Sequence, residues 1–326
     1  MTSPDRTRAE TPNAATPGTR VRRWVRLGLK IVPPVMLIAA GWVLWREFHK
    51  LSWSAVRDTI DHWGFVAVSL ALLLSATSFL LMGLIEWTGL RWTGAKVPLR
   101  TVALGSFLAN GIAHAVGANL LTSSAVRART YARHGVSLTQ VAAATAFDAT
   151  AFGVGIAALS GGGLLLASSA ELDATAITPL VARCVGTALV AGALGYVALC
   201  AFVRRSFRIF GRNITLPDVW DALAQLVLGV VDNGVAAAIL WVLLPKGDPS
   251  YLTFIGAFAL SAVVGLLSSV PGGAGVFEGT MMTLLPQANT AALAAAFLGY
   301  RLAYYLLPLA LAAAVLAIDA IRHRKT

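Results

Sequence analysis

Long apolar segments separated by short polar ones organise this chain. Crossing the hydrocarbon core of a bilayer as an α-helix takes about 20 predominantly apolar residues. Six segments meet that requirement: residues 27–45, 64–86, 138–160, 177–203, 219–244 and 290–318. The pattern therefore predicts an integral membrane protein built from α-helices.

Residues 46–63 have a different pattern. Their apolar side chains recur at the spacing of one helix face, with acidic and basic residues between them. A helix with one apolar and one charged face is typical of the membrane interface. We expect this segment to lie along the membrane surface before the second span.

Two further apolar segments, residues 101–118 and 251–270, decide the topology. Lys and Arg concentrate in cytoplasmic loops, and the basic residues before the first span place the N-terminus there. If both segments enter the membrane and return to the same side, 20 of the 26 Lys and Arg residues face the cytoplasm and four face outward. The remaining two, Arg183 and Arg301, lie within spans. Eight full crossings separate the charges less well.

The two returning segments also resemble each other. Residues 97–127 superpose without a gap on residues 248–278, which places Pro98 on Pro249 and Gly105 on Gly256. One segment starts inside and the other outside, as in the inverted repeats of many transporters. The expected fold is therefore an all-α polytopic membrane protein of about six transmembrane helices and two re-entrant helical hairpins.

The turns of these hairpins are expected where helix-breaking or small polar residues follow an apolar run. Proline removes a backbone donor, glycine permits a reversal, and a broken helix needs burial in protein or a wet cavity. An ordinary loop between two crossings is the alternative. The expected tips contain Asn119, Ser123 and Ser124 in the first hairpin, and Pro271, Gly272, Gly273 and Gly275 in the second.

Composition agrees with the membrane assignment. Hydrophobic residues make up 57% of the chain and charged residues 13%, against about 25% charged residues in a soluble domain. The net charge is +11, and the basic residues cluster between the apolar segments. This distribution indicates orientation in a membrane rather than nucleic-acid binding. Cys184 and Cys200 are expected to be small buried hydrophobes. We expect no metal and no cofactor, because no ligand cluster, nucleophile–base arrangement or ATP-binding motif is found.

Charged residues inside the apolar segments are the candidate site. Such residues are costly in hydrocarbon and are usually paired or functional. The arginines suit a lipid phosphate through their planar donor fork, whereas the carboxylates suit a cationic headgroup or a coupling proton. The expected lipid-binding residues are Arg127, Glu278, Arg301, Asp148 and Asp232.

Alternative roles remain open for these charges. They could form a structural ion-pair network that holds the helices together. Arg127 and Glu278 occupy equivalent places in the two repeats, and we expect them to pair where the hairpin tips meet. Glu86, near the end of its span, and Arg183 are expected to be structural or interfacial.

Two regions resemble the flippase domain of the lysylphosphatidylglycerol synthase/flippase family (multiple peptide resistance factor). They are residues 120–147 and residues 270–312, and the resemblance extends over most of residues 25–320. The family form P-G-G-x-G-[VF]-F-E, followed by Y-R-x-x-Y-Y-x-x-P, is matched by Pro271, Gly272, Gly273, Gly275, Phe277, Glu278, Tyr300, Arg301, Tyr304, Tyr305 and Pro308. The family form A-V-R-x-R is matched by Ala125, Val126, Arg127 and Arg129.

The resemblance implies translocation of a membrane phospholipid. Long family members carry a soluble aminoacyl-transferase domain after the membrane part, whereas this sequence ends at Thr326. We therefore expect a short form that is not an enzyme and that moves an anionic or aminoacylated phospholipid between leaflets. The alternatives are a membrane-embedded enzyme acting on lipid headgroups and a non-catalytic partner of an envelope-lipid synthase.

The sequence divides into three parts. Residues 1–24 are expected to form a disordered basic cytoplasmic tail, residues 25–320 the transmembrane domain, and residues 321–326 a short basic cytoplasmic tail. A bacterial plasma (inner) membrane is the expected location, with both termini cytoplasmic. Expected partners are a membrane phospholipid, a separately encoded lipid synthase and a second copy of the chain.

Overall fold

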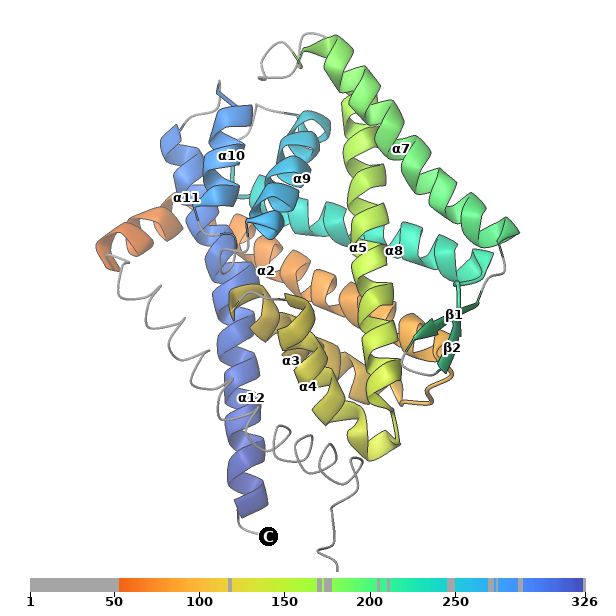
Figure 1. Ribbon diagram of the computed structural model, residues 1–326. Coiled ribbons are helices and arrows are strands. Elements are labelled where there is room, and N and C mark those ends of the chain that lie inside the picture. Colours follow the sequence, from red (N-terminus) through yellow and green to blue (C-terminus); the bar gives the residue numbers. More distant parts are fainter. Residues whose placement is uncertain are drawn as a thin grey trace, which may run out of the picture.

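The computed structural model shows a bundle of helices of different lengths (Figure 1). It describes residues 53–116, 119–168, 172, 178–203, 206–209, 212–244, 250–268, 273, 275–286 and 290–324. The predicted span at residues 27–45 and both predicted tails therefore lie outside the described residues, apart from residues 321–324.

Helices account for nearly all of the described elements. They are α2 (Trp53–Trp92), α3 (Leu99–Val116), α4 (Asn119–Tyr131), a 3₁₀ turn (Ala132–His134), α5 (Leu138–Leu166), α7 (Pro179–Phe202), α8 (Val219–Trp241), α9 (Tyr251–Leu267), α10 (Val276–Leu284), α11 (Thr290–Arg301), a π-helical turn (Leu302–Leu306) and α12 (Leu307–Arg324). The all-α prediction is confirmed. One small addition is a two-stranded antiparallel ribbon, β1 (Ser206–Ile209) and β2 (Arg212–Thr215).

Five described helical segments are long and apolar enough to cross a membrane: Trp63–Trp92, Leu138–Leu166, Pro179–Phe202, Val219–Trp241 and Ala292–Asp319. They coincide with five of the six predicted spans. Their outward surfaces are apolar, as lipid contact requires; Phe202 on α7, for example, is 87% exposed. The chain is a multi-pass membrane protein.

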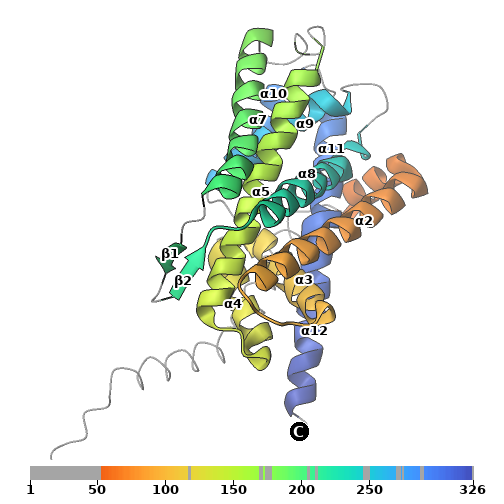
Figure 2. The same cartoon turned by 90° about the vertical axis from the view of Figure 1, so that its right-hand side faces the viewer.

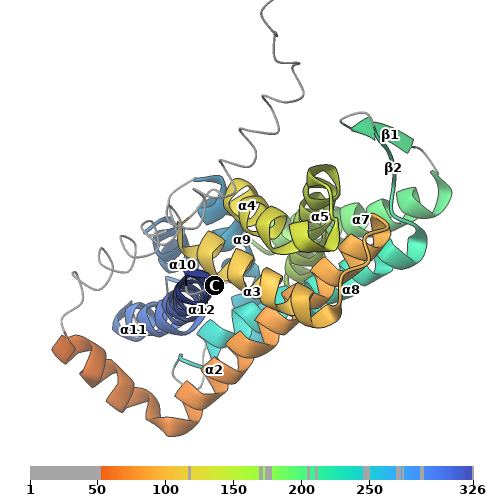
Figure 3. The ribbon, with the colours of Figure 1, turned by 90° about the horizontal axis from the view of Figure 1, so that it is seen from below.

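Helix α2 bends where the predicted interfacial segment meets the span. Gly64 has φ 66°, a left-handed backbone conformation that glycine adopts at little cost. Figure 3 shows the part before this bend turned away from the rest of α2. The two parts therefore run in different directions, as the change of sequence pattern predicts.

The segments predicted as hairpins form pairs of packed helices, α3 with α4 and α9 with α10. In the second, Gly273 and Gly275 have φ values of 61° and 84°, which supports the prediction of a glycine-dependent reversal. A Cβ on Gly273 would also lie 3.4 Å from the Cα of Gly265 in α9. Pro271 and Gly272 lie outside the described residues.

The first hairpin differs from the prediction at its tip. Helix α4 begins at Asn119, so Ser123 and Ser124 lie inside the helix rather than in the turn. Serine favours turns and helix caps over helix interiors, but both hydroxyl groups have partners here. Ser123 Oγ accepts from Arg127 of the same helix across 3.4 Å, and Ser124 Oγ donates to Thr145 Oγ1 of α5 across 3.2 Å.

Helix α5 stands at the centre of the bundle and packs against α2, α7, α8 and α9 (Figures 1 and 2). Its closest approach is to α8. A Cβ on Gly155 would lie 2.2 Å from the carbonyl carbon of Gly229. Glycine at both positions lets the two backbones touch, which is how membrane helices gain van der Waals contact in the absence of a hydrophobic driving force.

The last span contains a π-helical turn with a clear cause. Pro308 has no N–H to donate, and the N–H of Leu307 bonds the carbonyl of Leu302. The carbonyl of Ala303 is left without its usual helical donor. Ser75 of α2 supplies one instead, with its hydroxyl 2.8 Å from that carbonyl oxygen. The turn therefore ties the last span to α2, and π turns of this kind are frequent at functional sites.

Candidate functional site

The first charged cluster lies between α2, α4 and α5. One guanidinium nitrogen of Arg127, Nη2, is 2.9 Å from Glu86 Oε2 and 2.7 Å from Asp148 Oδ2. The side chains of Arg127 and Glu86 are 3% and 0% exposed, and that of Asp148 is 17% exposed. A single arginine therefore holds two carboxylates from different helices inside the protein.

Neutral groups complete this cluster. Tyr131 donates its phenolic hydrogen to Glu86 Oε1 across 2.5 Å. Nη1 of Arg127 is 3.4 Å from Ser123 Oγ, one turn earlier on α4, and 3.3 Å from Thr145 Oγ1 on α5. Nε of Arg127 is buried and has no hydrogen-bond partner among the described residues. The arginine thus retains donor capacity that the described protein groups do not use.

The second cluster joins α10 and α11. Oε1 of Glu278 is 2.6 Å from Nη2 of Arg301 and accepts a hydrogen bond of 2.7 Å from its Nε. Oε2 of Glu278 accepts from the backbone N–H of Gly275 at the start of α10, 2.8 Å away. The two side chains are 16% and 19% exposed. The guanidinium carbon of Arg301 lies 5.8 Å from the ring centroid of Tyr305.

These two clusters are reciprocal. In the first hairpin the arginine is on the second helix, and its aspartate partner is on the next span. In the second hairpin the glutamate is on the second helix, and its arginine partner follows 23 residues later on the next span. An ion pair therefore links each helix pair to the span that follows it, with the charges exchanged.

The expected pair between Arg127 and Glu278 is wrong. Arg127 is bound by Glu86 and Asp148, and Glu278 is bound by Arg301. Residues that are equivalent in an inverted repeat occupy corresponding places, and they meet only if both lie on the pseudo-symmetry axis. Of the five predicted site residues, the structure brings together Arg127 with Asp148 and Glu278 with Arg301.

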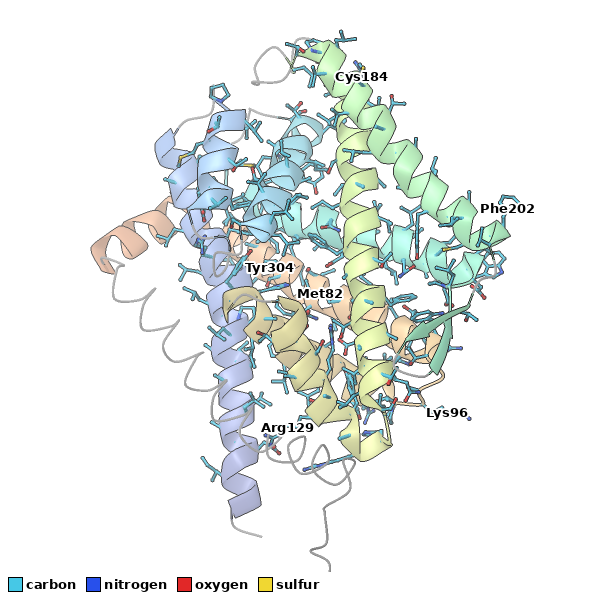
Figure 4. All side chains as sticks on the ribbon, in the orientation of Figure 1. Met82, Lys96, Arg129, Cys184, Phe202 and Tyr304 are labelled. Carbon is cyan, nitrogen blue, oxygen red and sulfur yellow. The ribbon has the colours of Figure 1, made fainter. Side chains whose placement is uncertain are left out.

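Asp232 belongs to neither cluster. It lies on α8, is 7% exposed, and accepts a hydrogen bond of 2.6 Å from Ser78 of α2. The Ser78 hydroxyl oxygen is 2.9 Å from the hydroxyl of Tyr304 in the π-helical turn. Tyr304, labelled in Figure 4, is 5% exposed and belongs to the apolar cluster against which Met82 of α2 packs. Asp232 is thus held by neutral groups.

Glu86 is the residue that the sequence interpretation placed least well. It was expected near the aqueous end of its span, yet it is completely buried. The sequence does contain an indication of this burial. Polar residues recur at helical spacing on one face of α2, namely Ser75, Ser78 and Glu86. All three are 4% exposed or less, so the polar stripe of α2 faces the bundle.

The remaining polar candidates have structural roles. Arg183 donates to the carbonyls of Leu165 and Ala167 at the end of α5, in agreement with the structural role expected for it.

Cys184 and Cys200 form no disulfide, and Cys184 is exposed rather than buried as predicted. Within the described ranges, no group of three His, Cys, Asp or Glu side chains could hold a metal ion.

The described fold and site define a class, a multi-pass helical membrane protein in which arginine–carboxylate pairs join short helices to the spans. Comparison with known protein families gives a match over most of the chain. Residues 27–312 match the family model described as "Lysylphosphatidylglycerol synthase TM region", and the chain belongs to this family.

Two relatives match along most of both chains. An uncharacterised protein of Synechocystis sp., slr0712, is 31% identical over 288 residues, which are 86% of this chain and 88% of that protein. The inner membrane protein YbhN of Escherichia coli is 30% identical over 297 residues, which are 89% of this chain and 91% of that protein. Both relatives are short family members that lack a synthase domain.

Proposed function

We propose that this protein moves an anionic or aminoacylated phospholipid between the leaflets of a bacterial inner membrane. The observation that carries the proposal is the pair of reciprocal arginine–carboxylate clusters, one for each helical hairpin. Family membership supports a lipid-related role, and the name of the E. coli relative supports the membrane assigned here.

The chemistry of the clusters suits a phosphodiester. A phosphate presents oxygens to a guanidinium group in the same forked geometry as a carboxylate does. Arg127 has an unused Nε donor inside the protein, and Arg301 is about one-fifth exposed. An arriving lipid phosphate competes with Asp148 or Glu278 for its arginine, and the released carboxylate is then available to a cationic headgroup.

The arrangement of the hairpins gives this exchange two alternating sites. In the proposed topology both termini are cytoplasmic and the two hairpins are re-entrant from opposite faces of the membrane, so the clusters are reached from opposite leaflets. Transport then consists of breaking one cluster while the other stays closed, as expected for alternating access in an inverted repeat. The carboxylate partners keep the unoccupied site electrically compensated.

An apolar groove beside the last span suits the hydrocarbon part of a lipid. It has a volume of about 310 Å³ and lies between α2 and the π-helical turn and α12. Its lining includes Val68 and Leu72 on one side and Leu302 and Leu306 on the other. A lipid acyl chain can lie in this groove without any polar group being desolvated, while its headgroup passes through the polar interior.

Purified protein in liposomes tests the proposal directly. A fluorescent phosphatidylglycerol in both leaflets is exposed to an impermeant bleaching agent, and movement between leaflets is read from the loss of the protected fraction. We expect wild-type protein to remove that protection. Arg127→Gln and Arg301→Gln should retain it, whereas Arg100→Gln should behave like wild type because Arg100 is exposed at the start of α3.

Two results would contradict the proposal. Wild-type liposomes that protect the inner-leaflet lipid as well as protein-free liposomes do would exclude translocation of this lipid. A change in the mass of the lipid during the assay would instead indicate a headgroup-modifying enzyme. Mass spectrometry of the extracted lipid distinguishes these outcomes.

A further inference from the structure

Asp232 differs from the other buried carboxylate in the way its charge is compensated. The buried charged side chains of the described residues are Glu86, Arg127 and Asp232. Glu86 and Arg127 form an ion pair with each other. Asp232 makes no ion pair within the described part of the chain, and its hydrogen-bond donor is the neutral hydroxyl of Ser78.

A carboxylate without a cation is unstable in such surroundings. Transferring an unpaired charge from water to a medium of low polarity costs far more than protonating the group, and intramembrane acids that lack a cation mark proton pathways. The protonated acid is neutral and needs only hydrogen bonds, which the site provides. A sodium ion would need more oxygen ligands than the carboxylate and two hydroxyl groups found here.

Two neutral groups, Ser78 and Tyr304, form a short hydrogen-bonded string with Asp232, and the string ends at Tyr304. Ser78 Oγ lies 2.6 Å from Asp232 Oδ1 and 2.9 Å from the hydroxyl of Tyr304. The ring centroid of Tyr304 lies 5.5 Å from that of His114, at the end of α3 in the first hairpin. Nδ1 of His114 is buried and has no hydrogen-bond partner among the described residues.

We propose that Asp232 is the proton-carrying group of this protein, and that Ser78 and Tyr304 stabilise it in both protonation states. This proposal rests on the proposed function, to which it adds the driving force. When the acid is ionised, Ser78 donates to Oδ1 of Asp232, as in the structure, and Tyr304 can donate to Ser78. When the acid is protonated, Asp232 donates to Ser78 and Ser78 donates to Tyr304. Both hydroxyl groups keep their own protons, and Asp232 exchanges its proton with water on the side to which the site is open.

The hydrogen-bonded string connects elements that the transport proposal needs to couple. Asp232 is on α8, Ser78 on α2, and Tyr304 in the π-helical turn three residues after Arg301. A change in the charge of Asp232 therefore acts on the span that carries the arginine of the second cluster.

Other titratable groups lie near Asp232. The hydroxyl of Tyr304 is linked to it through Ser78, and the ring of Tyr300 stacks on that of Tyr304 with centroids 5.4 Å apart. Phenols carry a proton throughout the physiological pH range. Asp232 is accordingly the group of this string that changes protonation there.

Infrared spectroscopy of the purified protein tests the proton site independently of transport. Wild-type protein should show the carbonyl absorption of a protonated carboxylic acid that disappears as the pH is raised. Asp232→Asn should lack this absorption. Asp221→Asn should retain it, because Asp221 lies in the first turn of the same helix and is not part of the hydrogen-bonded string of Asp232, Ser78 and Tyr304. If wild type and Asp232→Asn give the same spectrum at every pH, Asp232 carries no proton and the proposal fails.

Transport under an imposed pH gradient tests the coupling. One pH unit corresponds to about a tenfold equilibrium shift per coupled proton, so wild-type protein should change the lipid ratio between leaflets about tenfold. Asp232→Asn should give an unchanged ratio. Lipid movement that ignores the pH gradient, or that follows a sodium gradient instead, overturns the proton proposal and leaves the transport proposal intact. Absence of any lipid movement overturns the transport proposal, and the infrared result then decides the proton site by itself.

Discussion

Replacing Arg127 by glutamine provides a sharp test of the first cluster. Arg127 Nη2 lies within 2.9 Å of carboxylate oxygens from two helices, and the side chain is 3% exposed. Breaking a buried pair by removing one partner costs about 3–5 kcal/mol, because an uncompensated charge remains. Arg127→Gln leaves Glu86 and Asp148 without their cation. We expect it to destabilise the protein by an amount in this range.

The structure also predicts how the variants of this cluster rank in loss of stability. Glu86→Gln should cost less than Arg127→Gln, because Arg127 keeps Asp148 as a partner. The double variant Arg127→Gln/Glu86→Gln should lose less than the sum of the single variants, since residues that interact are not additive. Thermal unfolding of the detergent-solubilised protein, followed by tryptophan fluorescence, ranks the four proteins.

A matched control lies two residues away. Arg129 is on the same helix, but it is 3.7 Å from Asp319, and the two side chains are 37% and 44% exposed. Exposed pairs contribute about 0–1 kcal/mol, so Arg129→Gln should unfold close to wild type. Equal losses for Arg127→Gln and Arg129→Gln, or exact additivity of the Arg127 and Glu86 losses, would refute the buried-cluster argument.

Three further predictions concern packing, pairing and topology. Gly155→Ala should lower the unfolding temperature markedly because its Cβ would overlap α8, whereas Gly153→Ala on the same helix should not, because nothing lies within 4 Å of that Cβ. Equal effects would contradict the close approach of the two helices. The charge exchange Glu278→Arg/Arg301→Glu should recover part of the stability that either single change removes; a double variant no more stable than the singles would argue against the pair. In a cysteine-free background, Ser137→Cys should resist an impermeant thiol reagent added to intact cells, and labelling would contradict a first hairpin that returns to the cytoplasm.

Much of the fold was predictable from the spacing of apolar residues. Five spans, both helix pairs and the bend before residue 64 follow from segment length and helix-breaking residues. These features are local, because each depends on whether its own residues can bury backbone polar groups. The small ribbon β1–β2, in the connection between α7 and α8, was not predicted.

The pairing of charges was less predictable because it depends on contacts between distant elements. The sequence identifies charged residues in apolar segments, and the structure bears out that these are buried or paired. It does not indicate which arginine meets which carboxylate. Glu86 is paired only because Arg127 and Tyr131 of α4 lie against it. Ser78 was missed as a partner of Asp232 because the spacing of polar residues on α2 does not show which helix that face contacts.

Lipid retention by the purified protein is the most direct measurement of the central claim, which is that the arginines of the two clusters bind the lipid phosphate. Native mass spectrometry of the protein released from mild detergent counts phosphatidylglycerol molecules that stay bound. Wild type and Arg100→Gln should retain the lipid, and the retained lipid should be strongly reduced in Arg127→Gln and Arg301→Gln. If both of these variants retain as much phosphatidylglycerol as wild type, the arginine–carboxylate clusters are not the lipid site.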